Sequence, residues 1–79
     1  MNGWQASMRR LVSRILNRGD NEVYSLEFVS ANRVLIYKNG YIIMTRTTNY
    51  DIASHWKSEA REIILSITED KIKSLLLSV

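Results

Sequence analysis

The 79-residue sequence lacks cysteine and proline entirely, and it contains only three glycines and one histidine. Without cysteine, the chain has neither a disulfide framework nor a zinc site built on thiolates. This composition fits a reducing compartment, so we expect a cytoplasmic location. The sequence also has no apolar run near the ~18 residues that a membrane-spanning helix needs.

The first eighteen residues lack acidic side chains, which raises the question of a targeting segment. A secretory signal is excluded because Arg14 interrupts the apolar stretch Leu11–Leu16. A mitochondrial transit peptide is an alternative, since residues 1–18 are rich in arginine and contain serine. We expect instead that they form part of the folded domain.

Apolar side chains are abundant, because hydrophobic residues make up 46% of the chain. That fraction is too high for an intrinsically disordered protein, and the length predicts a single domain over residues 1–79. A domain of this size buries only about 60–65% of the surface of its unfolded chain. Apolar surface left over would therefore favour pairing with a partner or a second copy.

The net charge of +3 is distributed unevenly. Residues 1–18 carry four arginines and no acid, whereas residues 19–79 sum to −1. Residues 4–18 also have the apolar spacing of an amphipathic helix, with Gly19 as its C-cap. The expected apolar face comprises Trp4, Met8, Leu11, Val12, Ile15 and Leu16. The arginines Arg10, Arg14 and Arg18 follow at i, i+4 and i+8 on the opposite side, with Arg9 at the edge.

Three segments rich in β-branched and aromatic residues predict strands at 22–30, 33–38 and 41–48. Asn39-Gly40 is typical of a two-residue hairpin, and Ala31-Asn32 predicts a second tight turn. A regular ladder from these turns places Arg33 opposite Arg46, where an anion between the two guanidinium groups would relieve their repulsion. The same ladder predicts a buried sheet face of Tyr24, Leu26, Phe28, Leu35, Tyr37, Ile42 and Met44.

Apolar residues at helical spacing predict a helix over 50–67, with Asn49 or Asp51 as its N-cap. A third helix is expected from about Thr68, or from Ser66 with a capping box. The fold class is therefore α+β, a small two-layer domain of order α-β-β-β-α-α with a three-stranded antiparallel sheet packed by helices. Apolar residues that fall off these faces favour a homodimer; they are Leu65, Leu77, Val34, Ile36 and Ile43.

The order of these elements is similar to that of the double-stranded RNA-binding domain, and the resemblance is confined to topology. That family has glycines in its second sheet loop and a basic cluster at the start of its last helix. Here residues 45–52 contain no glycine, and the helix begins next to Asp51.

Few residues suit catalysis. His55 with Asp51 and Glu59 forms an i−4, i, i+4 row that resembles a metal site, although a solvated helix flank has the same pattern. Both Gly19 and Gly40 are explained by local turns rather than by a phosphate-binding loop. We therefore expect a non-enzymatic protein with no cofactor and no metal.

The arginine row is the strongest functional signal. An acid-free row of arginines predicts a nucleic-acid-binding protein, DNA or RNA, that contacts phosphates through its first helix. The expected contact residues are Arg9, Arg10, Arg14, Arg18, Arg33 and Arg46. Tyr41 and Tyr50 are candidates for base stacking, while the other aromatic residues are assigned to the core.

Three alternatives to nucleic-acid binding remain. The arginine row has the pattern of an ordinary solvated helix face. It also suits a protein-interaction module, such as a small inhibitor or adaptor that docks on an acidic protein. A basic helix with Trp4 at its apolar side fits a membrane surface too, but that side is needed to cover the sheet.

Overall fold

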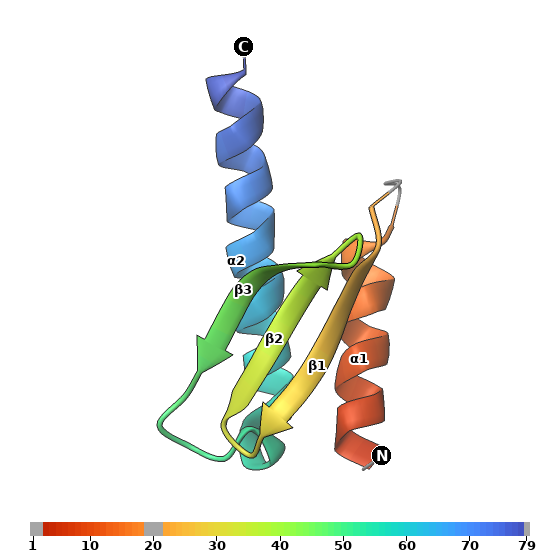
Figure 1. The fold of residues 1–79 in the computed structure, drawn as a ribbon, viewed down its shortest axis with the longest axis vertical. Helices are drawn as coiled ribbons and strands as arrows, with labels where there is room; N and C mark the ends of the chain where they lie inside the picture. The colour runs from red at the N-terminus through yellow and green to blue at the C-terminus, as the bar shows by residue number, and fades with distance from the viewer. Residues whose placement is uncertain (1–2, 19–21, 79) are drawn as a thin grey trace.

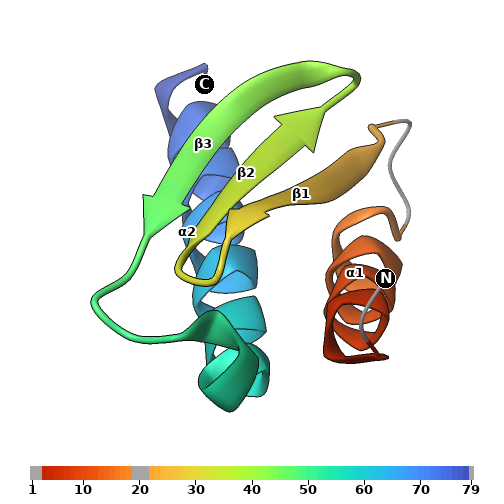
Figure 2. The same cartoon turned by 60° about the horizontal axis from the view of Figure 1, so that its bottom comes forward.

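The computed structural model describes residues 3–18 and 22–78 of the chain. The elements follow the order α1 (Gly3–Leu16), β1 (Tyr24–Ser30), β2 (Arg33–Lys38), β3 (Tyr41–Thr47), a short 3₁₀ helix η1 (Ile52–His55) and α2 (Trp56–Leu77). The strands form one antiparallel sheet in the order β1-β2-β3 (Figure 1). Helices α1 and α2 cover the same face of this sheet (Figure 2). The expected α+β class and open three-stranded sheet are confirmed.

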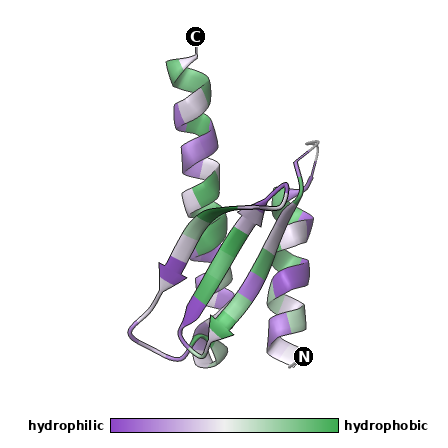
Figure 3. Cartoon of the chain, in the orientation of Figure 1, coloured by the Kyte–Doolittle hydropathy of each residue, from purple (hydrophilic) through white to green (hydrophobic). Residues whose placement is uncertain are grey.

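The hydrophobic core lies between the sheet and the two helices. Its buried members come from every element except β3: Met8, Val12, Leu16, Tyr24, Leu26, Val34, Ile36, Ile52, Ala60, Ile63 and Ile67. Strand β3 adds Met44, which is partly buried against the cluster. Figure 3 shows hydrophobic residues in the middle of the sheet, with the two helices behind it.

Helix α1 is the amphipathic helix that the sequence predicts, with a shorter C-terminal end. Met8, Val12 and Leu16 are buried at i, i+4 and i+8, and the helix ends at Leu16. Asn17 then connects the end of α1 to strand β1, because its Oδ1 accepts a 2.8 Å hydrogen bond from the Tyr24 backbone N–H. The predicted C-cap Gly19 lies outside the described residues.

The β2–β3 hairpin turns at Asn39-Gly40 as predicted. Asn39 has φ 53° and Gly40 φ 87°, the positive values that a type I′ turn requires. The pairs that flank the turn, Lys38 with Tyr41 and Tyr37 with Ile42, also match the prediction.

Beyond the turns the predicted strand register is wrong, because each hairpin contains an irregularity. Ile36 pairs with Met44, so that Ile43 is an extra residue in β3. Phe28 pairs with Val34 although Ser30 pairs with Arg33, so that Val29 is extra in β1. A slip of one residue reverses which side chains face the core.

The buried face of the sheet is consequently reversed in β2. Val34 and Ile36, which were assigned to the outer face and to a surplus apolar patch, are fully buried. Leu35 and Tyr37 lie partly exposed on the uncovered face, together with the exposed Ile42. Tyr24 and Leu26 are buried as predicted.

The C-terminal half of the chain forms one helix instead of the predicted two. Asp51 caps η1, and its Oδ1 accepts a 2.9 Å hydrogen bond from the Ala53 N–H. Helix α2 then continues for 22 residues through Ser66 and Thr68, where a boundary was expected. The Ser66 hydroxyl donates to the Glu62 carbonyl four residues earlier, so it does not cap a new helix. The last turns of α2 extend well past the sheet (Figure 1).

Candidate polyanion-binding surface

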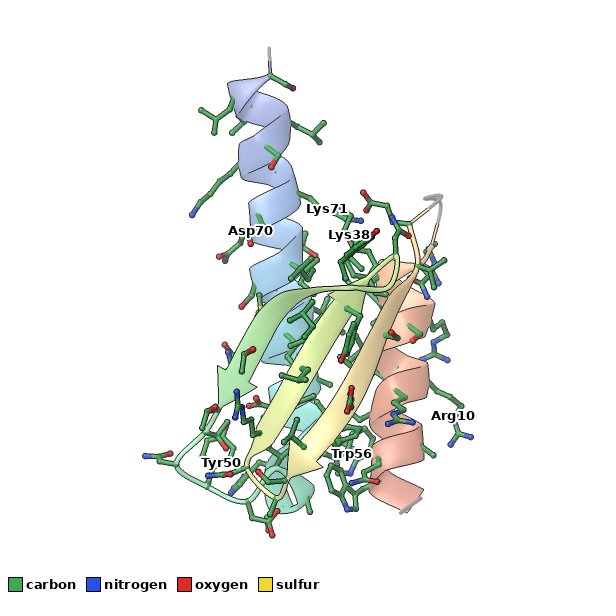
Figure 4. The ribbon with its side chains drawn as sticks, viewed as in Figure 1. Arg10, Lys38, Tyr50, Trp56, Asp70 and Lys71 are labelled. Atoms are coloured by element: carbon green, nitrogen blue, oxygen red, sulfur yellow. The ribbon has the colours of Figure 1, made fainter. Side chains whose placement is uncertain are left out.

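The exposed face of α1 carries the arginine side chains singled out from the sequence. Arg10 and Arg14 are exposed and lie one turn apart, with Met8 and Val12 buried on the opposite side of the helix. Arg18 is also exposed, but it follows the helix in a turn, so the regular row ends at Arg14. Figure 4 shows Arg10 extending away from the body of the protein.

These three guanidinium groups are available to an outside ligand. Within residues 3–18 and 22–78, none of Arg10, Arg14 and Arg18 forms an ion pair. In the described part of the chain, their one side-chain hydrogen bond is a 3.5 Å contact from Arg10 to the Ser7 hydroxyl. Since α1 itself contains no acidic residue, its exposed face carries positive charge alone.

A shallow depression of about 430 Å³ lies on the surface between α1 and the start of α2. Its lining residues are Ser7, Arg10, Leu11, Arg14 and Trp56. Lys57, the next residue on α2, is exposed and places its Nζ 5.7 Å from the centre of the Trp56 ring. The depression therefore combines an aromatic wall from α2 with two arginines from α1, and Lys57 adds a cation beside the Trp56 ring. Such a mixture suits nucleic acid. We call these residues, together with Lys57, the α1–α2 basic surface.

Arg9 lies on the flank of α1, where it packs against the sheet. Its guanidinium carbon is 5.4 Å from the centre of the Phe28 ring, a cation–π geometry. The Trp4 ring meets the same Phe28 edge-on, with ring centres 5.1 Å apart. Arg9 is partly buried and contributes to packing as well as to positive charge.

Arg33 and Arg46 do not face each other, contrary to the sequence-based expectation. Arg33 pairs with Thr47 and Arg46 pairs with Val34. The two arginines are therefore offset by one residue, and their side chains point to opposite faces of the sheet. Arg33 is exposed, whereas Arg46 points toward α2, so the sheet does not hold an anion between them.

Arg46 is bound instead to a fully buried carboxylate. Its Nε donates to Glu59 Oε2 at 2.5 Å, and the Tyr50 hydroxyl donates to Glu59 Oε1 at 2.6 Å. Burial opposes the charged form of Arg46, but the hydrogen bond and charge of Glu59 outweigh it and raise the pKa of the guanidinium. The hydrogen bond to Glu59 likewise raises the pKa of Tyr50. We call these three residues the Glu59 network.

The Glu59 network also changes how the row around His55 is interpreted. Glu59 is buried with both oxygens occupied, whereas His55 and Asp51 are exposed. The His55 ring packs edge-on against Tyr50, with centres 5.0 Å apart. In the described part of the chain, no group of three His, Cys, Asp or Glu side chains could hold a metal ion.

The stacking candidates differ in exposure. Tyr41 is 78% exposed beside the β2–β3 turn, while Tyr50 has its hydroxyl committed to Glu59. Trp56, assigned to the core from the sequence, is partly buried and also lines the depression beside Arg10.

A second and larger depression, about 670 Å³, lies between the β2–β3 turn and the distal part of α2. Glu22 sits at its rim and is held by Lys38 at 2.8 Å, by Lys71 at 3.3 Å and by the Tyr24 hydroxyl at 2.8 Å. These contacts, that of Lys38 first, lower the pKa of Glu22 to about 2. Lys38 and Lys71 approach each other above the sheet in Figure 4. Because Glu22 neutralises these lysines, they are less available to an anion than the arginines of α1.

The lowered pKa of Glu22 predicts a stability change in acid. The unfolded chain protonates Glu22 near pH 4.5, before the folded chain does at about 2, so this contribution is present above pH 4.5 and is lost as the pH falls toward 2. We expect Glu22→Gln to lower the melting temperature at pH 6 and to differ little from the parent at pH 2. Thermal melts by circular dichroism test this, with Glu69→Gln on α2 as the control. A pH-independent difference between parent and Glu22→Gln would contradict the prediction.

Comparison with known proteins identifies no relative, since the chain matches no family model, no curated protein and no solved structure. Among the described residues, neither helix is long and apolar enough to cross a bilayer. The interpretation of the α1–α2 basic surface therefore relies on its own chemistry.

Proposed function

We propose that this protein binds nucleic acid, DNA or RNA, through the α1–α2 basic surface and performs no catalysis. Within this surface Arg10 and Arg14 contact backbone phosphates, and Lys57 adds charge from α2. Arg18, just after α1, makes a third phosphate contact beside the surface, with Arg9 in support. The observation that carries the proposal is the pair Arg10 and Arg14, which are exposed, without an ion pair in the described chain, and located on a helix without acids.

The geometry of the surface supports phosphate contacts. Arg10 and Arg14 are separated by one helical turn, a rise of roughly 6 Å, which is comparable to the spacing of neighbouring phosphates along a strand. Arginine offers two parallel N–H donors to a phosphate, and each neutralised phosphate releases counterions. Trp56, which lines the depression together with Arg10 and Arg14, provides a flat ring for an unpaired base.

Two of the six arginines named from the sequence are omitted from the proposed contact. Arg46 is bound to Glu59, and Arg33 lies on the uncovered face of the sheet. Phosphate contacts position a protein without reading sequence, so we propose binding with little sequence preference. We further propose that the protein acts in the cytoplasm as a homodimer, which would double the number of arginines that contact one ligand.

Fluorescence anisotropy tests the proposal directly. The full chain is titrated against labelled duplex DNA, single-stranded DNA and duplex RNA at several salt concentrations. We expect binding whose log–log salt dependence has a slope of about −2 to −3, from three phosphate contacts at ~0.7–0.9 each. The preferred probe identifies the ligand class. Absence of binding at low salt to all three probes would refute the proposal.

A protein-interaction module that docks on an acidic protein is the second candidate. The observation that favours it is the uncovered face of the sheet, where Leu35, Tyr37 and Ile42 are partly or largely exposed. A mixed protein interface depends weakly on salt, because only its rim charges are screened. A shallow slope against an acidic polypeptide, with no nucleic-acid binding, would favour this candidate.

A further inference from the structure

Helix α2 reverses its apolar side along its length. Up to Ile67, the apolar side faces the sheet, where Ala60, Ile63 and Ile67 are almost completely buried. The same side then continues with Lys71, Ser74 and Ser78, which line the larger depression. A helix that served only this domain would stay apolar on the sheet side or end where the core ends.

A second apolar stripe begins on the other side of α2. It comprises Leu65, Ile72, Leu75 and Leu76, which are 52–71% exposed. At 100° per residue the four side chains lie within an arc of about 100°, centred roughly 140° from the buried stripe. The step of seven from Leu65 to Ile72, followed by three to Leu75, has the a/d spacing of a helix that packs against another helix. We call these four residues the distal stripe.

Most of the distal stripe lies clear of its own chain; Leu75, at one edge of the stripe, also lines the larger depression. Figure 1 shows α2 extending past the ends of the strands, and Figure 3 shows apolar segments on its last turns. The longest dimension of the molecule is 41 Å against 23 and 20 Å for the others, which reflects this extension. Pairing with another helix would therefore meet no obstruction from the sheet.

We propose that the distal stripe is the interface of a homodimer, in which α2 packs against α2 of a second copy. Charge does not oppose a second copy at this surface, because residues 61–78 carry three basic and three acidic side chains and two copies do not repel. The face of α1 carries arginines alone and would repel its own copy. The two surfaces are thus suited to different ligands.

The area of the stripe predicts a reversible dimer. The free energy of burying a Leu or Ile side chain, divided by the free energy per unit of apolar area, gives an area of ~60–120 Å² for each side chain. Since 52–71% of each side chain is exposed, the four side chains of both copies would together bury about 300–600 Å² of apolar area in the dimer. With a usual polar share this is a total of about 500–1,000 Å², the size of a weak or transient interface. We expect dissociation in the micromolar range.

Sedimentation equilibrium of the full chain, from micromolar to millimolar concentration, tests the proposal. We expect a mass that rises to twice 9.2 kDa, and a single-chain mass throughout for Ile72→Glu/Leu76→Glu. Leu77→Glu is the matched control, because Leu77 is 88% exposed but lies about 140° from Ile72 around the helix. Far-UV circular dichroism confirms that each variant folds. A wild-type mass of one chain at every concentration would overturn the proposal, as would a dimer that survives Ile72→Glu/Leu76→Glu.

Cysteine cross-linking gives an independent readout, since the natural chain has no cysteine. Under mild oxidation, Ile72→Cys is expected to form a disulfide-linked dimer, and Leu77→Cys is not. Equal cross-linking at both positions would indicate random collision and contradict a defined interface. Arg10→Gln/Arg14→Gln is expected to dimerise normally, so the dimer and the nucleic-acid proposal can fail separately.

Discussion

Replacing Arg46 with methionine is expected to lower the free energy of unfolding by about 3–5 kcal/mol. The substitution keeps the apolar stem of the side chain but leaves Glu59 as a charge in a site with no solvent exposure. A buried charge without its partner is costly, and among the described residues only the Tyr50 hydroxyl still donates a hydrogen bond to it. For a chain of 79 residues, whose total stability is expected to be about 4–12 kcal/mol, this loss brings the protein close to unfolding.

A double-mutant cycle separates the ion pair from general packing. We expect Arg46→Met/Glu59→Leu to recover most of the stability lost in Arg46→Met, because an apolar pair can replace a buried ion pair at little cost. Urea denaturation of the parent, both single variants and the double variant supplies the four free energies. The control is Arg33→Met, which removes an exposed arginine from the same strand. A loss below about 1 kcal/mol for Arg46→Met would show that Glu59 is not held as we describe.

The positions of the helices and strands could be predicted from the sequence more accurately than the residue pairing between the strands. The Asn39-Gly40 turn determined the adjacent pairs correctly, because its backbone geometry is local. The irregularities at Val29 and Ile43 have no marker such as glycine in the sequence, so a regular ladder was the simplest expectation. Each slip exchanged the two faces of the sheet, which moved Val34 and Ile36 into the core.

The sequence predicts two helices in place of α2, because the apolar pattern changes direction after Ile67. Apolar periodicity identifies the side of a helix that faces the core. A shift of that side along the sequence is also typical of one helix ending and a second helix beginning. Neither glycine nor proline stands at the change, and this absence was the available signal that the helix continues. The buried Glu59 was assigned to a solvated flank, because an acidic residue is rarely fully buried unless it is paired.

The candidate site was predicted in part. Arg10 and Arg14 follow from helical spacing alone, and their exposure agrees with it. The contribution of α2 could not be predicted, because the depression beside Trp56 exists only where α1 and α2 pack together. Arg46 was misassigned since its partner Glu59 lies thirteen residues away on another element.

If the α1–α2 basic surface binds nucleic acid, Arg10→Gln/Arg14→Gln is expected to weaken binding on the order of 10–100-fold near 0.1 M salt. Each phosphate contact with a duplex releases about 0.9 counterion. Losing one contact is therefore expected to lower the affinity near 0.1 M salt by somewhat less than tenfold. The salt slope should become shallower by about 1.8 for the same reason. Both side chains are exposed, so the fold and the melting temperature should change little.

The matched control removes the same net charge elsewhere. Arg33→Gln/Lys73→Gln changes two exposed cations, one on the uncovered sheet face and one on the distal part of α2. Because phosphate contacts are short in range, this variant should bind within a few-fold of the parent and keep its salt slope. Equal losses in the two double variants would mean that binding follows net charge, and the α1–α2 basic surface would then have no special role. A loss confined to Arg10→Gln/Arg14→Gln would instead locate the phosphate contacts on α1, where the acid-free helix face concentrates the positive charge.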